Sequence, residues 1–297
     1  MKTPVTIIIF NRPDLTKKML TELREYSPTH LLVIADGPRN SEEARLCDET
    51  RKVVSSCVDW ECRIEWNSSE VNLGLEVRVE TGLDWVFDKV DRAIVVEDDC
   101  CLARSFFLFC DELLDRYESN EKVLAITASN FQDGKKWGEG DYYFSRYPHC
   151  WGWATWRRAW DLYDSEMSDL DQVIEREALR EVLDRERPYR GWIKKFRAAK
   201  KGVLNSWATK WTYACMKHGG LVVTPQENLV TNIGFDSRAT HTKNANSKNG
   251  FMNSSQVEFP LTHPKAVKRQ CHADSYVERR NFRSSFLSRF KRLIRTK

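Results

Sequence analysis

The sequence predicts an α/β protein with a mainly parallel, Rossmann-like sheet flanked by helices. Short, continuous apolar runs are typical of strands that are buried on both faces. In the first 130 residues these runs alternate with segments of helical periodicity, the pattern of a parallel sheet with crossover helices. A length of 297 residues is sufficient for one large domain of this kind.

The elements can be placed in order from the apolar runs and the punctuation between them. The expected strands are Val5–Phe10, Leu31–Ala35, Cys62–Trp66 and Ala93–Val96. The expected helices of this half are Asp14–Tyr26 behind Pro13, a helix capped by Ser41, and Glu76–Phe87. Two further helices are expected, over Asp169–Glu186 and Trp192–Lys201. Ligands of such a sheet bind at the carboxyl ends of the strands, so the loops after the strands are the expected site.

Composition excludes several classes of protein. Hydrophobic residues make up 41% and charged residues 30%, which is typical of a globular enzyme and excludes a disordered or collagen-like chain. No apolar run is long enough to span a bilayer, and the first apolar run is too short for a signal peptide. Nine Cys without a C-x-x-C pair indicate reduced thiols, which predicts a cytoplasmic protein.

The carboxyl-terminal segment 279–297 is strongly basic, with eight basic residues and no acidic one. Phe282, Phe286, Phe290 and Ile294 recur every four residues, which predicts an amphipathic helix. Two interpretations stay open: the helix lies on an anionic membrane surface, which we favour, or it docks on its own domain. The first predicts a peripheral location on the inner membrane face. Nucleic acid is not an expected partner, because basic and aromatic residues interleave nowhere else.

Changes in composition divide the chain into three parts. Eight of the eleven Trp lie between positions 137 and 211, far more densely than elsewhere. We therefore expect an α/β half over 1–130, a Trp-rich half over 131–260 that completes the same domain, and a basic tail over 261–297.

Three adjacent carboxylates are the strongest chemical signal. Glu97, Asp98 and Asp99 directly follow the apolar run 93–96, where their mutual repulsion must be compensated by a cation, by basic neighbours or by water. Mn²⁺ or Mg²⁺, held by one or two carboxylates and by substrate phosphates, is the favoured solution. The dinucleotide and P-loop glycine motifs are both missing from the sequence.

The segment IVVEDDC at 94–100 resembles the acidic motif of GT-A nucleotide-sugar glycosyltransferases, as in the N-acetylglucosaminyltransferase I family. A group of bacterial GT-A glycosyltransferases of surface-polysaccharide synthesis is similar in five ordered segments: FNRPDLT (10–16), ADGPR (35–39), NLGL (72–75), WGWATWRRAW (151–160) and NLVTNIGFDSRATHT (228–242). This resemblance implies a GT-A fold, with residues 1–130 binding the nucleotide sugar and 131–260 facing the glycan acceptor.

The resemblance also implies roles for individual residues. Asn11, Arg12 and Asp36 would hold the nucleoside, and Asn72, Gly74 and Arg78 would lie near the ribose and diphosphate. Asp99 would bind the metal, Asp98 would contact ribose or sugar, and Glu97 would support them. His241 is a second candidate for the metal or diphosphate site, although a lone His is more often structural.

Flat aromatic rings pack well against the apolar face of a sugar ring. Trp151 and Trp207 are therefore the expected contacts for the sugar or the glycan acceptor, and Gly152 would let the substrate approach the backbone. Trp156 and Trp160 are the expected packing residues.

A catalytic base is not evident in the sequence. Inverting relatives tend to carry an Asp close to the residue that is Trp207 here, but 205–209 reads Asn-Ser-Trp-Ala-Thr. The base lies elsewhere, with Asp236 as one candidate, or the mechanism is retaining, or the transferase is impaired.

The predicted function is metal-dependent transfer of a sugar from a nucleoside-diphosphate sugar, with UDP favoured, to a glycan or lipid-linked glycan in surface-polysaccharide synthesis. Two alternatives stay open. One is a catalytically impaired protein of the same fold that binds a glycan or a nucleotide sugar. The other is a metal-dependent nucleotidyltransferase.

Overall fold

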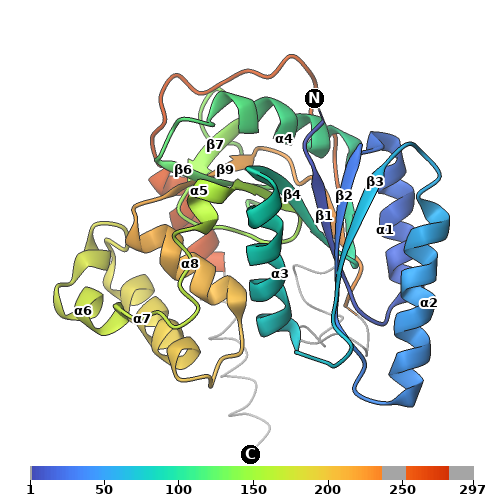
Figure 1. Cartoon of the computed structure of the whole chain (residues 1–297). Coiled ribbons are helices and arrows are strands. Elements are labelled where there is room, and N and C mark those ends of the chain that lie inside the picture. Colours follow the sequence, from blue (N-terminus) through green and yellow to red (C-terminus); the bar gives the residue numbers. More distant parts are fainter. Residues whose placement is uncertain (1, 236–251, 281–297) are drawn as a thin grey trace, which may run out of the picture.

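An eight-stranded sheet runs through the centre of the molecule in the order β3-β2-β1-β4-β8-β6-β9-β7 (Figure 1). The computed structural model describes residues 2–235 and 252–280. The strands of this sheet are β1 Val5–Ile9, β2 His30–Ala35, β3 Arg63–Ser68, β4 Arg92–Glu97, β6 Val123–Thr127, β7 Tyr142–Ser145, β8 Trp153–Trp156 and β9 Leu221–Pro225. The first four are parallel, whereas β8 and β7 run antiparallel to their neighbours. The predicted α/β fold with a mainly parallel sheet is confirmed.

Helices cover both faces of the sheet, as Figure 1 shows. They are α1 Pro13–Tyr26, α2 Ser41–Cys57, α3 Leu75–Lys89, α4 Arg104–Arg116, α5 Arg157–Trp160, α6 Leu170–Glu175, α7 Glu186–Lys200 and α8 Trp207–Lys217. Ile7 and Ile9 of β1 pack with α1 and α4 on one face, and Ile8 packs with α3 on the other. Burial on both faces explains why β1 is apolar without alternation.

The helical region after β8 differs from the prediction. A single helix over Asp169–Glu186 is wrong, because α6 ends at Glu175 and Glu177 adopts a left-handed backbone with φ 51°. A short 3₁₀ helix over Ala178–Arg180 follows, and α7 then begins at Glu186, before the predicted Trp192. These helices share a separate small core with α8, which stabilises a turn that local periodicity does not show.

Much of the Trp density belongs to the core. Trp153, Trp160, Trp207 and Trp211 contact one another through their rings, and all four are buried. Trp156 is the last residue of β8 and is also buried, so packing roles for Trp156 and Trp160 are confirmed.

A second sheet of two strands places β10 beside the acidic motif. β5, Cys100–Leu102, pairs antiparallel with β10, Val230–Asn232, so that Asn232 lies opposite Cys100.

The predicted cap of α2 differs from the structure by one residue. Asn40, and not Ser41, caps α2, because its Oδ1 accepts a hydrogen bond from the Glu43 amide at 2.9 Å.

Residues 261–280, at the start of the predicted tail, pack on the domain. Residues 271–280 are helical, and Asp274 accepts a hydrogen bond from the Ser145 hydroxyl at 2.6 Å. Arg146, only 1% exposed, is ion-paired with Glu278 and lies 3.7 Å from Asp274. The predicted amphipathic segment beyond 280 lies outside the described residues. Among the described helices, none has the length and apolar character needed to cross a bilayer.

We expect Arg146→Met to lower the free energy of unfolding by about 3 kcal/mol, because it leaves the buried carboxylates of Asp274 and Glu278 without this cation. Urea denaturation measures the change. Lys265→Met is the matched control, because Lys265 and Glu139 form an exposed pair, which contributes at most about 1 kcal/mol. Equal losses in the two variants would contradict this account of the buried cluster.

Candidate functional site

Three adjacent carboxylates lie at the carboxyl end of β4. Glu97 is the last residue of β4, and Asp98 and Asp99 occupy the turn before β5. Asp98 is 2% exposed and Asp99 is 8% exposed, so water cannot screen their repulsion. Arg12, in the loop between β1 and α1, donates from Nη1 to Asp99 Oδ2 at 3.0 Å and forms an ion pair with Asp98. Arg12 therefore supplies the basic neighbour that the motif requires.

Burial controls the charge of this cluster. It raises the pKa of Glu97, and the neighbouring charges of Asp99 and Asp98 raise it further. Burial also raises the pKa of Asp98, against the opposing effect of Arg12. Burial alone would lower the pKa of Arg12, but the charges of Asp98 and Asp99 raise it overall. The site therefore disfavours the charged forms of Glu97 and Asp98, and an additional cation would stabilise those charged forms.

Asp99 is the residue that the sequence assigned to a metal ion, and both of its carboxylate oxygens have close neighbours in the structure. Asp99 Oδ1 accepts a hydrogen bond from Asn232 Nδ2 at 3.3 Å, and a Cβ on Gly234 would lie 2.1 Å from Asp99 Oδ2. Over residues 2–235 and 252–280, no group of three or more His, Cys, Asp or Glu could hold a metal. An ion held by Asp99 and by phosphate oxygens is consistent with this donor set. Asp236 and His241 lie outside the described residues, so their roles stay predictions.

A cavity of about 520 Å³ opens at the carboxyl ends of β1 and β2. All eight residues that the sequence assigned to the nucleotide sugar line it: Asn11, Arg12, Asp36, Asn72, Gly74, Arg78, Glu97 and Asp98. They are far apart in the sequence and lie on loops, on α3 and at the end of β4, and the parallel register of β1, β2 and β4 brings them to one edge.

Asp36 anchors one wall of this cavity. Its Oδ1 accepts from the amides of Gly37 and Leu73, both at 2.9 Å. Its Oδ2 accepts from Asn72 Nδ2 at 3.0 Å and from the Gly74 amide at 3.1 Å. These four hydrogen bonds use the capacity of the carboxylate. In the structure Asp36 therefore holds the 72–74 loop, whereas the predicted bond to a nucleobase would require it to release one of these donors.

Arg78 lines the same cavity from α3 and is 4% exposed. Its Nη2 donates to the backbone and side-chain oxygens of Asn67, and burial lowers its pKa. Its Nε has no hydrogen-bond partner among the described residues, which leaves a buried donor at the cavity wall.

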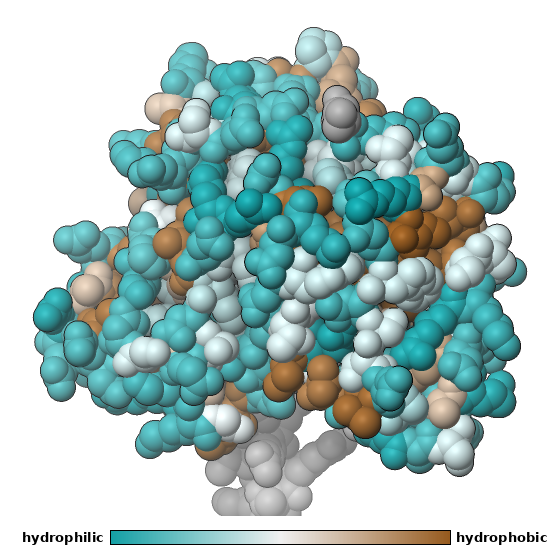
Figure 2. All heavy atoms as spheres, viewed as in Figure 1, coloured by the Kyte–Doolittle hydropathy of each residue, from teal (hydrophilic) through white to brown (hydrophobic). Residues whose placement is uncertain are grey.

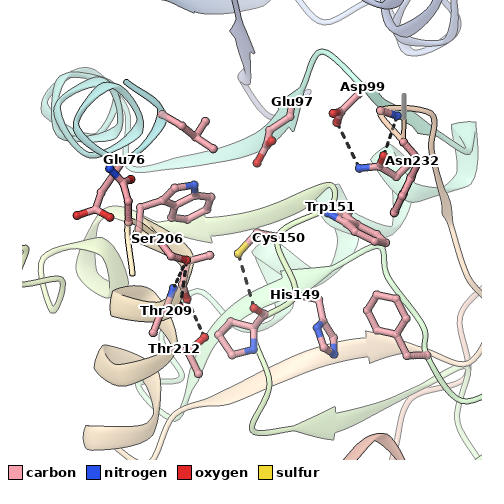
Figure 3. Close-up of a pocket in the computed structure, with 18 of the residues that line it drawn as sticks. Glu76, Glu97, Asp99, His149, Cys150, Trp151, Ser206, Thr209, Thr212 and Asn232 are labelled. Atoms are coloured by element: carbon pink, nitrogen blue, oxygen red, sulfur yellow. Dashed lines mark hydrogen bonds between the residues drawn. The ribbon is translucent and has the colours of Figure 1, made fainter. Parts of the chain in front are cut away.

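A second cavity, of about 450 Å³, lies on the other side of the acidic motif. Figure 3 shows Glu97 pointing into it, with Trp151 and His149 along one wall. Trp207 also lines it, although Trp207 is 3% exposed and its ring stacks on Trp153. Arg12 and Glu97 line both cavities, so the acidic motif lies between them.

The structure gives Gly152 a packing position, and its predicted contact with substrate stays a prediction. Gly152 lines neither cavity, and a Cβ at this position would approach Leu102 Cδ2 to 2.3 Å. Its φ of +65° also favours glycine. The close approach that requires a glycine at this position is packing against Leu102.

Two residues of the second cavity were not singled out from the sequence. Asn232 bonds to Asp99 from β10, and its segment was noted only for its resemblance. Glu76 lines the cavity from the first turn of α3, where an acidic residue is ordinarily explained by the helix dipole. Only the packing of α3 on α8 distinguishes Glu76 from a surface acid.

Comparison with known proteins gives a limited result. No family model and no curated protein match the chain. A UDP-glucose pyrophosphorylase complexed with UDP-glucose is similar over 55% of this chain and 79% of its own, with 9% identity and a TM-score of 0.34. A UTP-bound UGPase from Acinetobacter baumannii is similar over 78% and 88%, with 9% identity and a TM-score of 0.38. A cytidylyltransferase from Leptospira borgpetersenii is similar over 58% and 65%, with 13% identity and a TM-score of 0.33. Similarity this low assigns neither a family nor an activity.

We expect Asp36→Asn to destabilise the protein by about 1–3 kcal/mol, because the new amide group faces backbone N–H donors that it cannot satisfy. Thermal or urea denaturation measures the loss. Asp88→Asn on the exposed face of α3 is the control and should leave stability unchanged within about 0.5 kcal/mol. Wild-type stability in Asp36→Asn would show that the carboxylate is not the anchor of the 72–74 loop.

Proposed function

We propose that the protein is a metal-dependent glycosyltransferase that moves a sugar from a nucleoside-diphosphate sugar, UDP favoured, to a glycan or lipid-linked glycan. The observation that carries this proposal is the pair of cavities on either side of Glu97 and Arg12. One is lined by the predicted nucleotide residues and the other by Trp side chains. Transfer between two bound substrates requires such neighbouring sites.

The side chains divide the work of binding. Asn11 and the buried Nε of Arg78 offer donors to the nucleotide in the first cavity, and Trp151 offers a flat face to a sugar in the second. Arg12 holds Asp98 and Asp99 at the boundary. Mn²⁺ or Mg²⁺, held by Asp99, would neutralise the departing diphosphate as a Lewis acid.

Nucleotidyl transfer is the second candidate. It would use the same cavity and carboxylates, and two of the partly similar structures are a UDP-glucose pyrophosphorylase and a cytidylyltransferase. Against it, the loop after β1 reads Phe-Asn-Arg-Pro and brings one basic side chain, Arg12, which is already paired with Asp98 and Asp99. Catalysis on a triphosphate is expected to need more positive charge there.

Asp99→Ala is expected to abolish metal-dependent nucleotide-sugar binding while the fold stays intact, because the variant removes the proposed protein ligand of the ion. A thermal-shift screen with UDP-glucose, UDP-N-acetylglucosamine and GDP-mannose, each with and without Mn²⁺, measures it. A ligand at about 100 times its Kd stabilises the wild type by about 2.7 kcal/mol. Asp91→Ala, at a carboxylate that is 86% exposed, should keep the shift. An unchanged Mn²⁺-dependent shift in Asp99→Ala would reject the metal assignment.

The product distinguishes the candidate reactions. Sugar transfer releases a nucleoside diphosphate, whereas nucleotidyl transfer to a sugar phosphate releases pyrophosphate. We expect the wild-type protein, given the nucleotide sugar selected by the thermal screen and a panel of octyl glycosides, to release nucleoside diphosphate. Pyrophosphate release from a nucleoside triphosphate and a sugar 1-phosphate would establish the second candidate instead. Binding of a nucleotide sugar without either product would favour the impaired binding protein.

The basic segment beyond residue 280 is proposed to hold the protein on the inner membrane face, near a lipid-linked glycan. We expect a chain ending at residue 280 to bind vesicles of phosphatidylglycerol more weakly than the full chain, because six of the eight basic residues of 279–297 are then removed. Vesicle sedimentation measures this, with phosphatidylcholine vesicles as the control. Equal binding of both chains would return the segment to a packing role.

A further inference from the structure

Glu76 is a carboxylate of the second cavity that lies outside the acidic motif. It occupies the first turn of α3, and its side chain is 13% exposed. It lines the Trp-containing cavity but not the nucleotide cavity. The other carboxylates on the described wall of the second cavity are Glu97, which lines both cavities, and Asp99, which is paired with Arg12.

Lys210 of α8 holds Glu76 in place. Lys210 Nζ lies 2.5 Å from Glu76 Oε1 and 2.9 Å from Glu80 Oε1, and its side chain is 8% exposed. The Tyr163 hydroxyl donates to Glu80 Oε1 at 2.5 Å. One cation therefore serves two carboxylates, and Glu80 has a further donor that Glu76 lacks. Glu76 Oε2 is buried and accepts no hydrogen bond from the described residues.

The neighbouring hydroxyl groups on α8 cannot act as a general base in place of the Glu76 carboxylate. Ser206 Oγ caps α8 by accepting from the Thr209 amide at 3.3 Å, and it also accepts from the Thr209 hydroxyl at 3.1 Å. The Thr212 hydroxyl donates to the Ala208 carbonyl oxygen at 2.7 Å. Alcohols are too weakly basic to remove a proton from another alcohol without a base of their own.

Glu76 and Asp99 lie at opposite ends of the second cavity. Figure 3 shows Glu76 beside Ser206 and Thr209 at one end, Asp99 with Asn232 at the other, and Glu97 between them. A sugar held between the two ends would have its diphosphate towards Asp99 and its opposite face towards Glu76. This is the arrangement that an inverting displacement needs, since the attacking hydroxyl approaches the face opposite the leaving group.

We propose that Glu76 is the general base of an inverting sugar transfer, an inference that rests on the proposed function. The acceptor hydroxyl gives its proton to the Glu76 carboxylate as its oxygen forms a bond to the anomeric carbon. The bond from that carbon to the donor's phosphate oxygen breaks, and its electron pair leaves with the nucleoside diphosphate. Glu76 then returns the proton to solvent. The helix α3 thus supplies the acid that is absent from 205–209 on α8.

The test compares Glu76→Gln with Glu80→Gln. Both substitutions remove one carboxylate from Lys210, but Glu80 does not line the cavity. With the nucleotide sugar and the octyl glycoside that the wild type uses, Glu76→Gln should lower kcat by about 10²- to 10⁴-fold with the thermal shift by the donor retained. Glu80→Gln should stay within about threefold of the wild type if Lys210 has no other role in the reaction. Sodium formate should restore part of kcat to Glu76→Ala and none to Glu80→Ala, and NMR should show a product of inverted anomeric configuration.

Several results would overturn the assignment. Wild-type kcat in Glu76→Gln, equal losses in both glutamine variants, or a product of retained configuration would each remove Glu76 from the role of base while sugar transfer stands. If Glu76→Gln fails to fold, Glu76→Asp keeps a carboxylate on Lys210, and a wild-type kcat there with no response of Glu76→Ala to formate would reject it. If the wild type releases no nucleoside diphosphate with any donor, the proposed function fails first and this inference fails with it.

Discussion

The arrangement of the molecule depends on how it stabilises negative charge at the end of a buried strand. β4 carries Glu97, Asp98 and Asp99 to the edge of a sheet that is covered on both faces, where solvation is poor. Arg12 reaches them because β1 lies beside β4 in parallel register and its following loop ends at the same edge. That single cation fixes the β1–α1 loop, and the two cavities meet at this point.

The acidic residues that follow β2 and β4 have different partners, and these partners determine which carboxylate can bind a ligand. Asp36, after β2, accepts hydrogen bonds from neutral N–H donors of Gly37 and of the 72–74 loop. Its carboxylate therefore stabilises the structure of that loop. Asp99 is balanced mainly by an exchangeable ion pair and by the Asn232 amide. A ligand or an ion at Asp99 would have to share the carboxylate with Arg12 and Asn232, whereas at Asp36 it would have to replace N–H donors of the 72–74 loop.

The first half of the chain was predictable because its signals are local. Continuous apolar runs predicted the buried strands, and the rule that ligands bind at strand ends, together with the family resemblance, selected eight residues that line one cavity. The second half was less predictable because its structure depends on contacts between distant residues. In the Trp-rich segments, the ring of Trp153 packs in the core against the rings of Trp207 and Trp211. Gly152 is required because Leu102 lies too close for a larger residue. The spacing of residues along the chain predicts neither the contacts between these Trp rings nor the contact of Gly152 with Leu102.

The missing acid on α8 illustrates the same limit in chemical terms. A sequence comparison looks for a carboxylate beside Trp207, but a site needs a carboxylate at a position in space. α3 and α8 contact each other, so an acid on the first turn of α3 reaches the cavity wall that α8 also forms. Lys210 stabilises the Glu76 carboxylate at this position, because burying its negative charge without a cation would cost too much free energy. The pairing of Lys210 with both Glu76 and Glu80 is therefore better explained by a retained charge in the cavity than by stability alone, since one carboxylate would suffice to balance one lysine.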